Sequence, residues 1–192
     1  MSQITSAARF VIRGGVIVYP TETVYGLGAN ALDDQSVMRV FLIKKRPLSM
    51  PIFLAVSSLE MLEKVADIEE EDATLLKRLF PGPVSVLVRK KNIVPDCLTA
   101  GSKLVGIRFP ENEIAQKIID LAGPLTSTSA NITGSPPPSS ATEVSHEIAD
   151  KVDLVVDGGK SRYSRPSTLL DLTKREIIRP GAGLDLVLKA IS

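Results

Sequence analysis

The chain has little of what a metal site, a disulfide or an activated nucleophile requires. Its 192 residues include one cysteine, Cys97, one histidine, His146, and no tryptophan. A single cysteine cannot form a disulfide within the chain, and nothing in the sequence near Cys97 is expected to lower the pKa of its thiol. His146 has no second histidine or cysteine nearby, so we expect it at the surface and predict no metal site.

Long apolar runs and an excess of one charge are also absent. No run approaches the roughly 18 apolar residues of a membrane span, and the N-terminus has no signal-peptide core. The formal net charge is +1, so any basic surface must be local. We therefore expect a cytoplasmic protein with no membrane partner. The 4% aromatic content argues against broad binding of single strands by base stacking, although structured RNA can be recognised by its shape.

The common phosphate-binding fingerprints are missing or misplaced. The sequence contains no Gly-x-x-x-x-Gly-Lys-Ser/Thr, which excludes a P-loop. Segment 26–31 (GLGANA) matches Gly-x-Gly-x-x-Ala, but its glycines begin several residues after Tyr19, which ends a strand-like run. The position about 20 residues further on, where a ribose-binding acid belongs, lies in the basic segment 44–51. We interpret these glycines as tight packing or turn positions.

Apolar runs of strand length alternate with segments of helical period. With 44% apolar residues the chain can form one full-sized core, so we expect a single domain over residues 1–192. The predicted helices are 4–12, 33–46, 58–66, 73–80, 110–121, 141–149 and a short one after Gly183, and the predicted strands are 16–19, 52–56, 84–88, 104–107, 125–128, 154–156, 168–172 and 176–179. This alternation predicts an α/β protein of the α+β type with a mixed sheet.

Hydroxyls and an amide follow two of these apolar runs. Ser127, Ser129 and Asn131 are spaced by two residues, as are Thr21 and Thr23. In an extended segment each set shares one side of the chain, because side-chain direction has a period of two. These groups can act as fixed donors to a polyanion, or they can form polar turns without a special role.

Cations stand at two further element ends. Lys44 and Arg46 precede Pro47. They are either ordinary charges at a helix C-terminus or two cations aimed at one ligand. Arg108 ends a predicted strand, either as a surface charge or as a fork for a substrate carboxylate. Together with the hydroxyls, these cations indicate an enzyme that handles nucleotides.

These stretches together closely resemble the YrdC-like family in its short, single-domain form, the threonylcarbamoyl-AMP synthases that serve tRNA modification. The resemblance covers nearly the whole chain and rests on segments 20–27 (PTETVYGL), 44–47 (KKRP), 81–83 (PGP), 106–110 (GIRFP), 127–131 (STSAN) with Gly134, 167–168 (ST) with Asp171, and 179–181 (RPG). It implies a twisted, open mixed sheet with helices packed on it and a concave basic face.

The resemblance also implies an activity and roles for the matching residues. L-threonine, bicarbonate and ATP with Mg²⁺ would give L-threonylcarbamoyl-AMP and pyrophosphate, and a downstream tRNA threonylcarbamoyl transferase complex would use the product. Lys44 and Arg46 would be catalytic, Arg46, Met50, Ser129, Asn131 and Arg179 would bind ATP, and Thr23, Arg108, Ser127 and Ser167 would bind L-threonine. No residue stands out as a general base, so we expect catalysis by positioning and electrostatics.

Two departures from the family pattern and two alternatives remain. Met50 stands where relatives often carry Lys or Asn, and Ala55 stands where some longer members place a histidine. One alternative is an RNA-binding module of the same fold that contacts tRNA or double-stranded RNA without synthase activity. The other is a carbamoyl-adenylating relative, although the cysteines of the modules that surround such domains are missing here.

Overall fold

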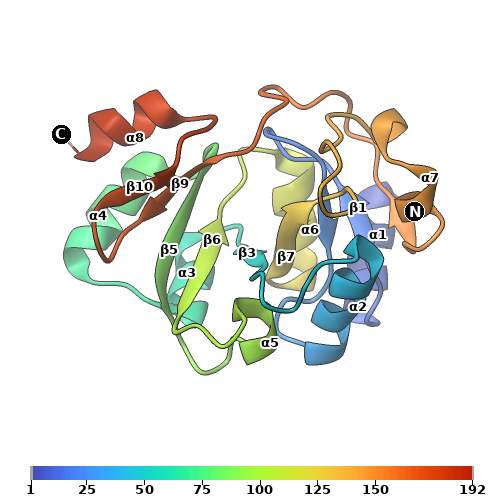
Figure 1. Cartoon of the computed structure of the whole chain (residues 1–192), viewed down its shortest axis with the longest axis horizontal. Coiled ribbons are helices and arrows are strands. Elements are labelled where there is room, and N and C mark those ends of the chain that lie inside the picture. Colours follow the sequence, from blue (N-terminus) through green and yellow to red (C-terminus); the bar gives the residue numbers. More distant parts are fainter. Residues whose placement is uncertain (1, 192) are drawn as a thin grey trace.

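A single mixed sheet organises the computed structural model, which describes residues 2–191 (Figure 1). Its strands are β1 (Ile17–Tyr19), β2 (Gly26–Gly28), β3 (Phe53–Ala55), β4 (Ala66–Asp67), β5 (Val84–Lys90), β6 (Leu104–Arg108), β7 (Leu125–Ser129), β8 (Leu154–Val155), β9 (Thr168–Asp171) and β10 (Glu176–Arg179). They run in the order β10-β9-β5-β6-β3-β7-β2-β1-β8, and β4 pairs with β5 off this path. The pairs β1–β8, β3–β6 and β5–β9 are parallel and the others are antiparallel, so the predicted mixed α/β sheet is confirmed.

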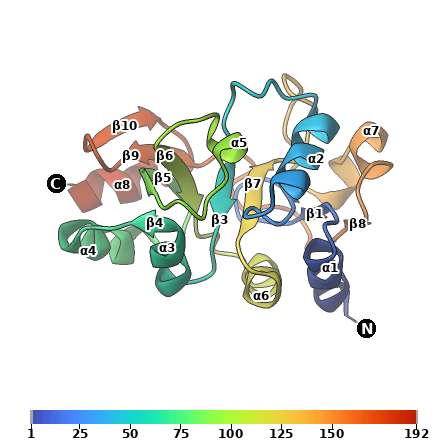
Figure 2. The ribbon, with the colours of Figure 1, turned by 90° about the horizontal axis from the view of Figure 1, so that it is seen from below.

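Helices cover both sides of this sheet. They are α1 (Gln3–Ile12), α2 (Asp34–Lys44), α3 (Leu59–Val65), α4 (Glu70–Leu79), α5 (Asp96–Thr99), α6 (Glu113–Ala122), α7 (His146–Ala149) and α8 (Leu184–Ile191), with a 3₁₀ turn at Ala141–Glu143. Figure 2 shows α1, α3, α4 and α6 on one side of the sheet and α2 and α5 on the other. No helix of the described part of the chain is both long enough and apolar enough to cross a membrane.

Strand β1 explains why one run of the sequence is apolar without alternation. Val16 and Val18 belong to the core on one face of the sheet, and Ile17 and Tyr19 belong to the core on the other face, beneath α1 and α6. A strand that is covered on both faces needs apolar side chains at every position. Segment 20–25 therefore continues from a strand that is covered on both faces.

The glycines of segment 26–31 form strand β2, which the sequence did not predict. Strand β2 pairs antiparallel with β1, and the side chain of Tyr19 lies against its backbone. A Cβ atom on Gly28 would lie 2.9 Å from Tyr19 Cδ1, and one on Gly26 would lie 3.1 Å from Tyr19 Cε1. The packing interpretation of these glycines is thus confirmed, whereas the turn interpretation is wrong.

Three other expectations about local structure need correction. The predicted helix 141–149 is a 3₁₀ turn and a separate α7, because Val144 and Ser145 have extended backbone between them. The segment between the predicted strands 84–88 and 104–107, for which we expected a loop, contains the short helix α5 with Cys97. The short strand β4 begins at Ala66, directly after α3, and pairs with the end of β5. In each case the elements have four residues or fewer, too few for a period to be recognised.

Candidate functional site

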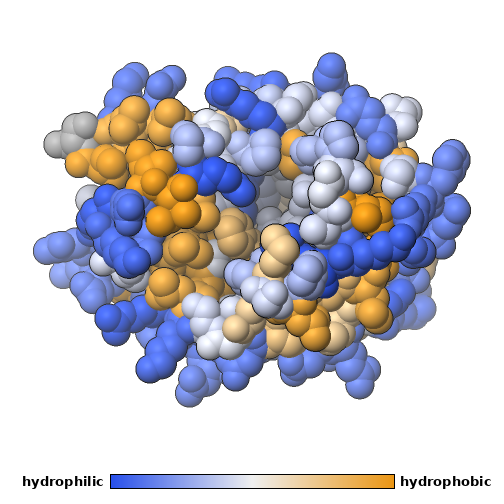
Figure 3. All heavy atoms as spheres, viewed as in Figure 1, coloured by the Kyte–Doolittle hydropathy of each residue, from blue (hydrophilic) through white to orange (hydrophobic). Residues whose placement is uncertain are grey.

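A cavity of about 200 Å³ opens on the face of the sheet beside the loop that follows α2. Figure 3 shows this face hollowed near its centre, with hydrophilic side chains on the rim. The walls come from segments far apart in the sequence: the segment after β1, the loop after α2, the ends of β6 and β7, and the segments around β9 and β10. Seven of the predicted site residues line it, namely Thr23, Arg46, Arg108, Ser127, Ser129, Ser167 and Arg179.

Lys44, Met50 and Asn131 are not among the lining residues. Lys44 ends α2 and is buried behind the wall formed by the end of β7. Its Nζ donates to the backbone oxygen of Ser129, to the backbone oxygen of Asn131 at 2.8 Å and to Asn131 Oδ1 at 3.4 Å. Burial, with a smaller effect of the nearby Arg46, lowers the pKa of Lys44 to about 7. The structure thus places Lys44 as a support of the wall.

The Asn131 side chain is likewise engaged within the protein. Its Nδ2 donates to the backbone oxygens of Ile132 at 2.9 Å and Ser135 at 2.6 Å. Asn131 therefore connects Lys44 to the loop that follows β7. The alternating pattern placed Asn131 on one side with Ser127 and Ser129, but β7 ends at Ser129, and the period of two does not extend into the turn beyond it.

Arg46 follows the left-handed Lys45, which ends α2, and turns toward the cavity. Its Nε donates to the Met50 backbone oxygen at 3.0 Å, and one terminal nitrogen donates to the Pro51 oxygen at 2.9 Å. Two of its five N–H groups are thus used for orientation. Met50 holds Arg46 through its backbone oxygen, while its own side chain is exposed.

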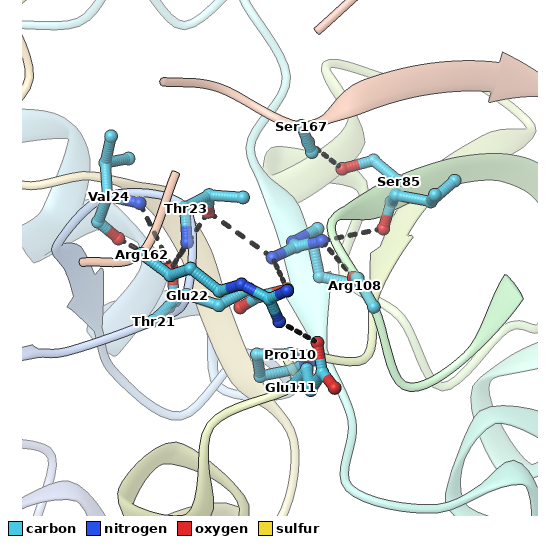
Figure 4. A network of polar contacts seen from close by, with 12 residues as sticks. Thr21, Glu22, Thr23, Val24, Ser85, Arg108, Pro110, Glu111, Arg162 and Ser167 are labelled. Carbon is cyan, nitrogen blue, oxygen red and sulfur yellow. Dashed lines mark hydrogen bonds and ion pairs between the residues drawn. The ribbon is translucent and has the colours of Figure 1, made fainter. Parts of the chain in front are cut away.

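Arg108 lines the cavity and connects the end of β6 to two other chain segments, 22–23 and 82–84 (Figure 4). One terminal nitrogen donates to the backbone oxygens of Gly82 at 2.6 Å and Val84 at 2.8 Å. The other donates to Glu22 Oε1 at 2.8 Å and to Thr23 Oγ1 at 3.4 Å. The ion pair with Glu22 is buried, with side-chain exposures of 4% for Arg108 and 3% for Glu22.

This environment decides between the two interpretations of Arg108. A surface charge is wrong, because Arg108 is buried. The fork is also already occupied, since hydrogen bonds within the described residues use all four hydrogens of its terminal nitrogens. The Nε–H remains as the donor that Arg108 can offer to a ligand.

Segment 21–24 forms a compact turn of hydroxyls and amides. Thr21 Oγ1 donates to the Val24 oxygen at 2.7 Å, accepts from the amides of Thr23 and Val24, and lies 2.9 Å from Thr23 Oγ1. The turn-capping interpretation is therefore correct for Thr21. Both threonines line the cavity, and Thr23 Oγ1 also accepts a hydrogen bond from Arg108 at 3.4 Å.

Ser85, Ser167 and Arg179 form the opposite wall. Ser85 Oγ lies 2.7 Å from Ser167 Oγ, and a terminal nitrogen of Arg179 donates to the Ser167 backbone oxygen at 3.1 Å. Burial lowers the pKa of Arg179, with a smaller effect of the neighbouring charge on Arg108. Ser85 was not predicted from the sequence, although a polar residue between Val84 and Val86 in a buried strand is a usable signal.

The remaining reactive residues lie outside this site. Within the described chain no group of three or more His, Cys, Asp or Glu residues could hold a metal ion. The Cys97 thiol donates to Asp34 Oδ1 at 3.1 Å, and burial together with this bond raises its pKa to about 11, which makes it a poor nucleophile. His146 is exposed at the start of α7, as predicted.

The fold and the cavity together define a protein that can bind an anion beside a small polar molecule. Three guanidinium groups, Arg46, Arg108 and Arg179, share the cavity with serine and threonine hydroxyls, and none of these groups must change protonation to bind. A family model described as "Telomere recombination", that of Sua5, YciO and YrdC, matches residues 9–181. The chain belongs to the Sua5/YciO/YrdC family, so the family resemblance seen in the sequence is confirmed.

Named relatives match almost the whole chain. A threonylcarbamoyl-AMP synthase of Pyrococcus abyssi is 43% identical over 96% of this chain and 55% of its own length. A threonylcarbamoyl-AMP synthase of Cellvibrio japonicus is 32% identical over 93% of this chain and 95% of its own length. The crystal structure of P. abyssi Sua5 complexed with L-threonine superimposes with a TM-score of 0.93 at 42% identity, covering 98% of this chain and 57% of that one. The chain thus spans about half the length of the archaeal relative and nearly all of the bacterial one.

Proposed function

We propose that this protein is an L-threonylcarbamoyladenylate synthase, which condenses L-threonine, bicarbonate and ATP to L-threonylcarbamoyl-AMP and pyrophosphate. The observation that carries the proposal is the cavity itself, in which arginines from three separate segments meet the hydroxyls of Thr23, Ser127, Ser129 and Ser167. Fixed cations suit a triphosphate, and hydroxyls suit a small polar amino acid. Relatives named threonylcarbamoyl-AMP synthase support the proposed activity.

The reaction would proceed in two balanced steps. The threonine amine attacks the bicarbonate carbon and water leaves, which gives a carbamate. A carbamate oxygen then attacks the α-phosphorus of ATP, and pyrophosphate leaves. Negative charge grows on the phosphate oxygens in the second step, where guanidinium groups stabilise it. Mg²⁺ would be carried by the phosphates.

Individual roles follow from which groups retain free donors. Arg46 and Arg179 each use only part of their guanidinium for orientation, so both are assigned to ATP, together with Ser129. Thr23, Ser127, Ser167 and the Nε–H of Arg108 are assigned to L-threonine. Lys44 and Asn131 are assigned to the support of the cavity wall that the end of β7 forms at Ser129, which is called the Ser129 wall below. In the cytoplasm, the product would pass to a tRNA threonylcarbamoyl transferase complex.

The test is incubation with labelled bicarbonate, L-threonine, Mg²⁺ and ATP, followed by detection of threonylcarbamoyl-AMP and of threonine-dependent pyrophosphate release. Failure to form the adenylate would refute the proposal. Arg46→Ala should abolish the release and leave the melting temperature nearly unchanged, because Arg46 contacts backbone oxygens at the surface of the cavity and no core residue. An active Arg46→Ala protein would show that the ATP side has been misplaced.

A further inference from the structure

A hydroxyl pair lies in the cavity wall. Ser85 is the second residue of β5 and lies in register between Arg108 on β6 and Leu169 on β9. It is 1% exposed, and its Oγ lies 2.7 Å from the Oγ of Ser167 (Figure 4). Both serines line the cavity. A buried hydroxyl is tolerated in a strand of valines only when it is hydrogen-bonded, so the contact with Ser167 is what keeps Ser85 satisfied.

The supply of donors and acceptors in this pair is limited. Each serine hydroxyl offers one proton and two lone pairs, and the contact between Ser85 and Ser167 consumes one proton. One proton and several lone pairs remain for the cavity. The chain at Ser167 is held in place, because Arg179 donates to its backbone oxygen and segment 167–168 pairs with Ala182. The pair can therefore donate one hydrogen bond and accept another, as an alcohol requires.

We propose that Ser85 is a positioning residue that fixes the direction of the Ser167 hydroxyl and thereby makes the site select an amino acid with a β-hydroxyl group. The inference rests on the proposed function, which assigns Ser167 to L-threonine. L-2-aminobutyrate has the same carbon skeleton without the hydroxyl, so it would leave the Ser85–Ser167 pair without its partner. A site built around such a bond rejects the analogue that lacks it.

The experiment compares L-threonine with L-2-aminobutyrate as substrates of the wild type and of Ser85→Ala. In Ser85→Ala, the ratio of kcat/KM for L-threonine to kcat/KM for L-2-aminobutyrate should fall about tenfold. This is the effect expected when a hydrogen bond between neutral groups is lost. The loss should appear in the KM for L-threonine, with the KM for ATP unchanged. Because Ser85 acts through Ser167, Ser85→Ala with Ser167→Ala should show the same preference as Ser167→Ala alone.

A matched control is Ser36→Ala. Ser36 is also 1% exposed, and its Oγ forms a hydrogen bond of similar length, 2.6 Å to Asp33 Oδ2, but it lies outside the cavity. It should lower the melting temperature and leave the amino-acid preference unchanged. Ser85→Thr, which keeps the hydroxyl, should preserve the preference, and Ser85→Cys, with its weaker donor, replaces Ser85→Ala if that variant does not fold.

Two results would overturn the inference: an unchanged preference in Ser85→Ala, or additive effects of Ser85→Ala and Ser167→Ala. A wild type that releases no pyrophosphate with L-threonine would instead refute the proposed function. In that event the same preference is measured as the ratio of calorimetric dissociation constants for the two amino acids, and an unchanged ratio in Ser85→Ala still overturns the role of Ser85.

Discussion

Replacing Lys44 by methionine should remove most of the activity and little of the stability. Lys44 is 1% exposed, and its ammonium group donates to three oxygens at the end of β7. Methionine has a similar length and volume but no donor. Ser129 and Asn131 would lose the charge-assisted bonds that hold them, each worth about 1.5–3 kcal/mol. The total loss from two good bonds is then about 3–6 kcal/mol.

The opposing effect comes from burial of the charge. Lowering the pKa of Lys44 from 10.5 to about 7 corresponds to about 5 kcal/mol against the buried ammonium. Methionine removes this cost, so the two effects nearly cancel, and we expect the free energy of unfolding to change by about 2 kcal/mol or less. The Ser129 wall, in contrast, loses its support. A displacement of about 1 Å at a positioning group can reduce the rate about a hundredfold.

The assays are threonine-dependent pyrophosphate release and urea denaturation of Lys44→Met. Lys45→Met is the control, because the neighbouring Lys45 is exposed and its ion pair with Glu147 lies at the surface. It should change neither quantity appreciably. Activity of Lys44→Met within about threefold of the wild type would refute the support role. A destabilisation above about 5 kcal/mol would show that burial of the charge is not as costly as its pKa indicates.

Three further predictions concern the same region. Activity should fall as the pH rises through about 7, because neutral Lys44 has two protons for three oxygens. The contribution of Lys44 to the free energy of unfolding should instead rise over pH 7–10.5, because the unfolded chain then binds more protons than the folded one. If the pH profiles of activity and of unfolding moved together, they would contradict this. Glu22→Ala should destabilise the fold by about 3–5 kcal/mol in urea denaturation, because it leaves the Arg108 charge buried without its partner, and a loss below about 1 kcal/mol would count against a buried pair. Gly28→Ala should lower stability by about 1–3 kcal/mol, since its Cβ would lie 2.9 Å from Tyr19 Cδ1, and an unchanged melting temperature would mean that the ring moves freely.

The mixed sheet, the long helices and the cations Arg46 and Arg108 could be predicted from local signals in the sequence, whereas Arg179 was predicted only from the family resemblance. Strand β5, with seven residues, and the periodic face of α6 are long enough to show their period. Strand β2 could not be predicted in this way. Glycines are poor strand formers, and only the Tyr19 side chain, which lies against them across the β1–β2 pair, explains why Gly26 and Gly28 are needed.

The direction of a side chain was harder to predict than its presence at the site. Lys44 and Arg46 are two residues apart, yet α2 ends between them at Lys45, whose left-handed backbone sends the two cations to different places. Arg108 was recognised as a strand-end cation, but its partners Gly82 and Glu22 are distant in the sequence. The period of a helix or strand says nothing about contacts of this kind.

Lys44 and Arg108 show how a fold can use buried charge to shape a site without exposing it. Each cation donates to backbone oxygens at the end of a strand, Lys44 at β7 and Arg108 beside β5. Backbone oxygens cannot titrate, so these contacts keep their geometry at any pH at which the cation is protonated. Arginine keeps its proton, whereas lysine with a pKa lowered to about 7 does not. The contacts of Arg108 with backbone oxygens should therefore persist above neutrality, and the loss of activity that follows from deprotonation of Lys44 should appear on the ATP side, as a higher KM for ATP.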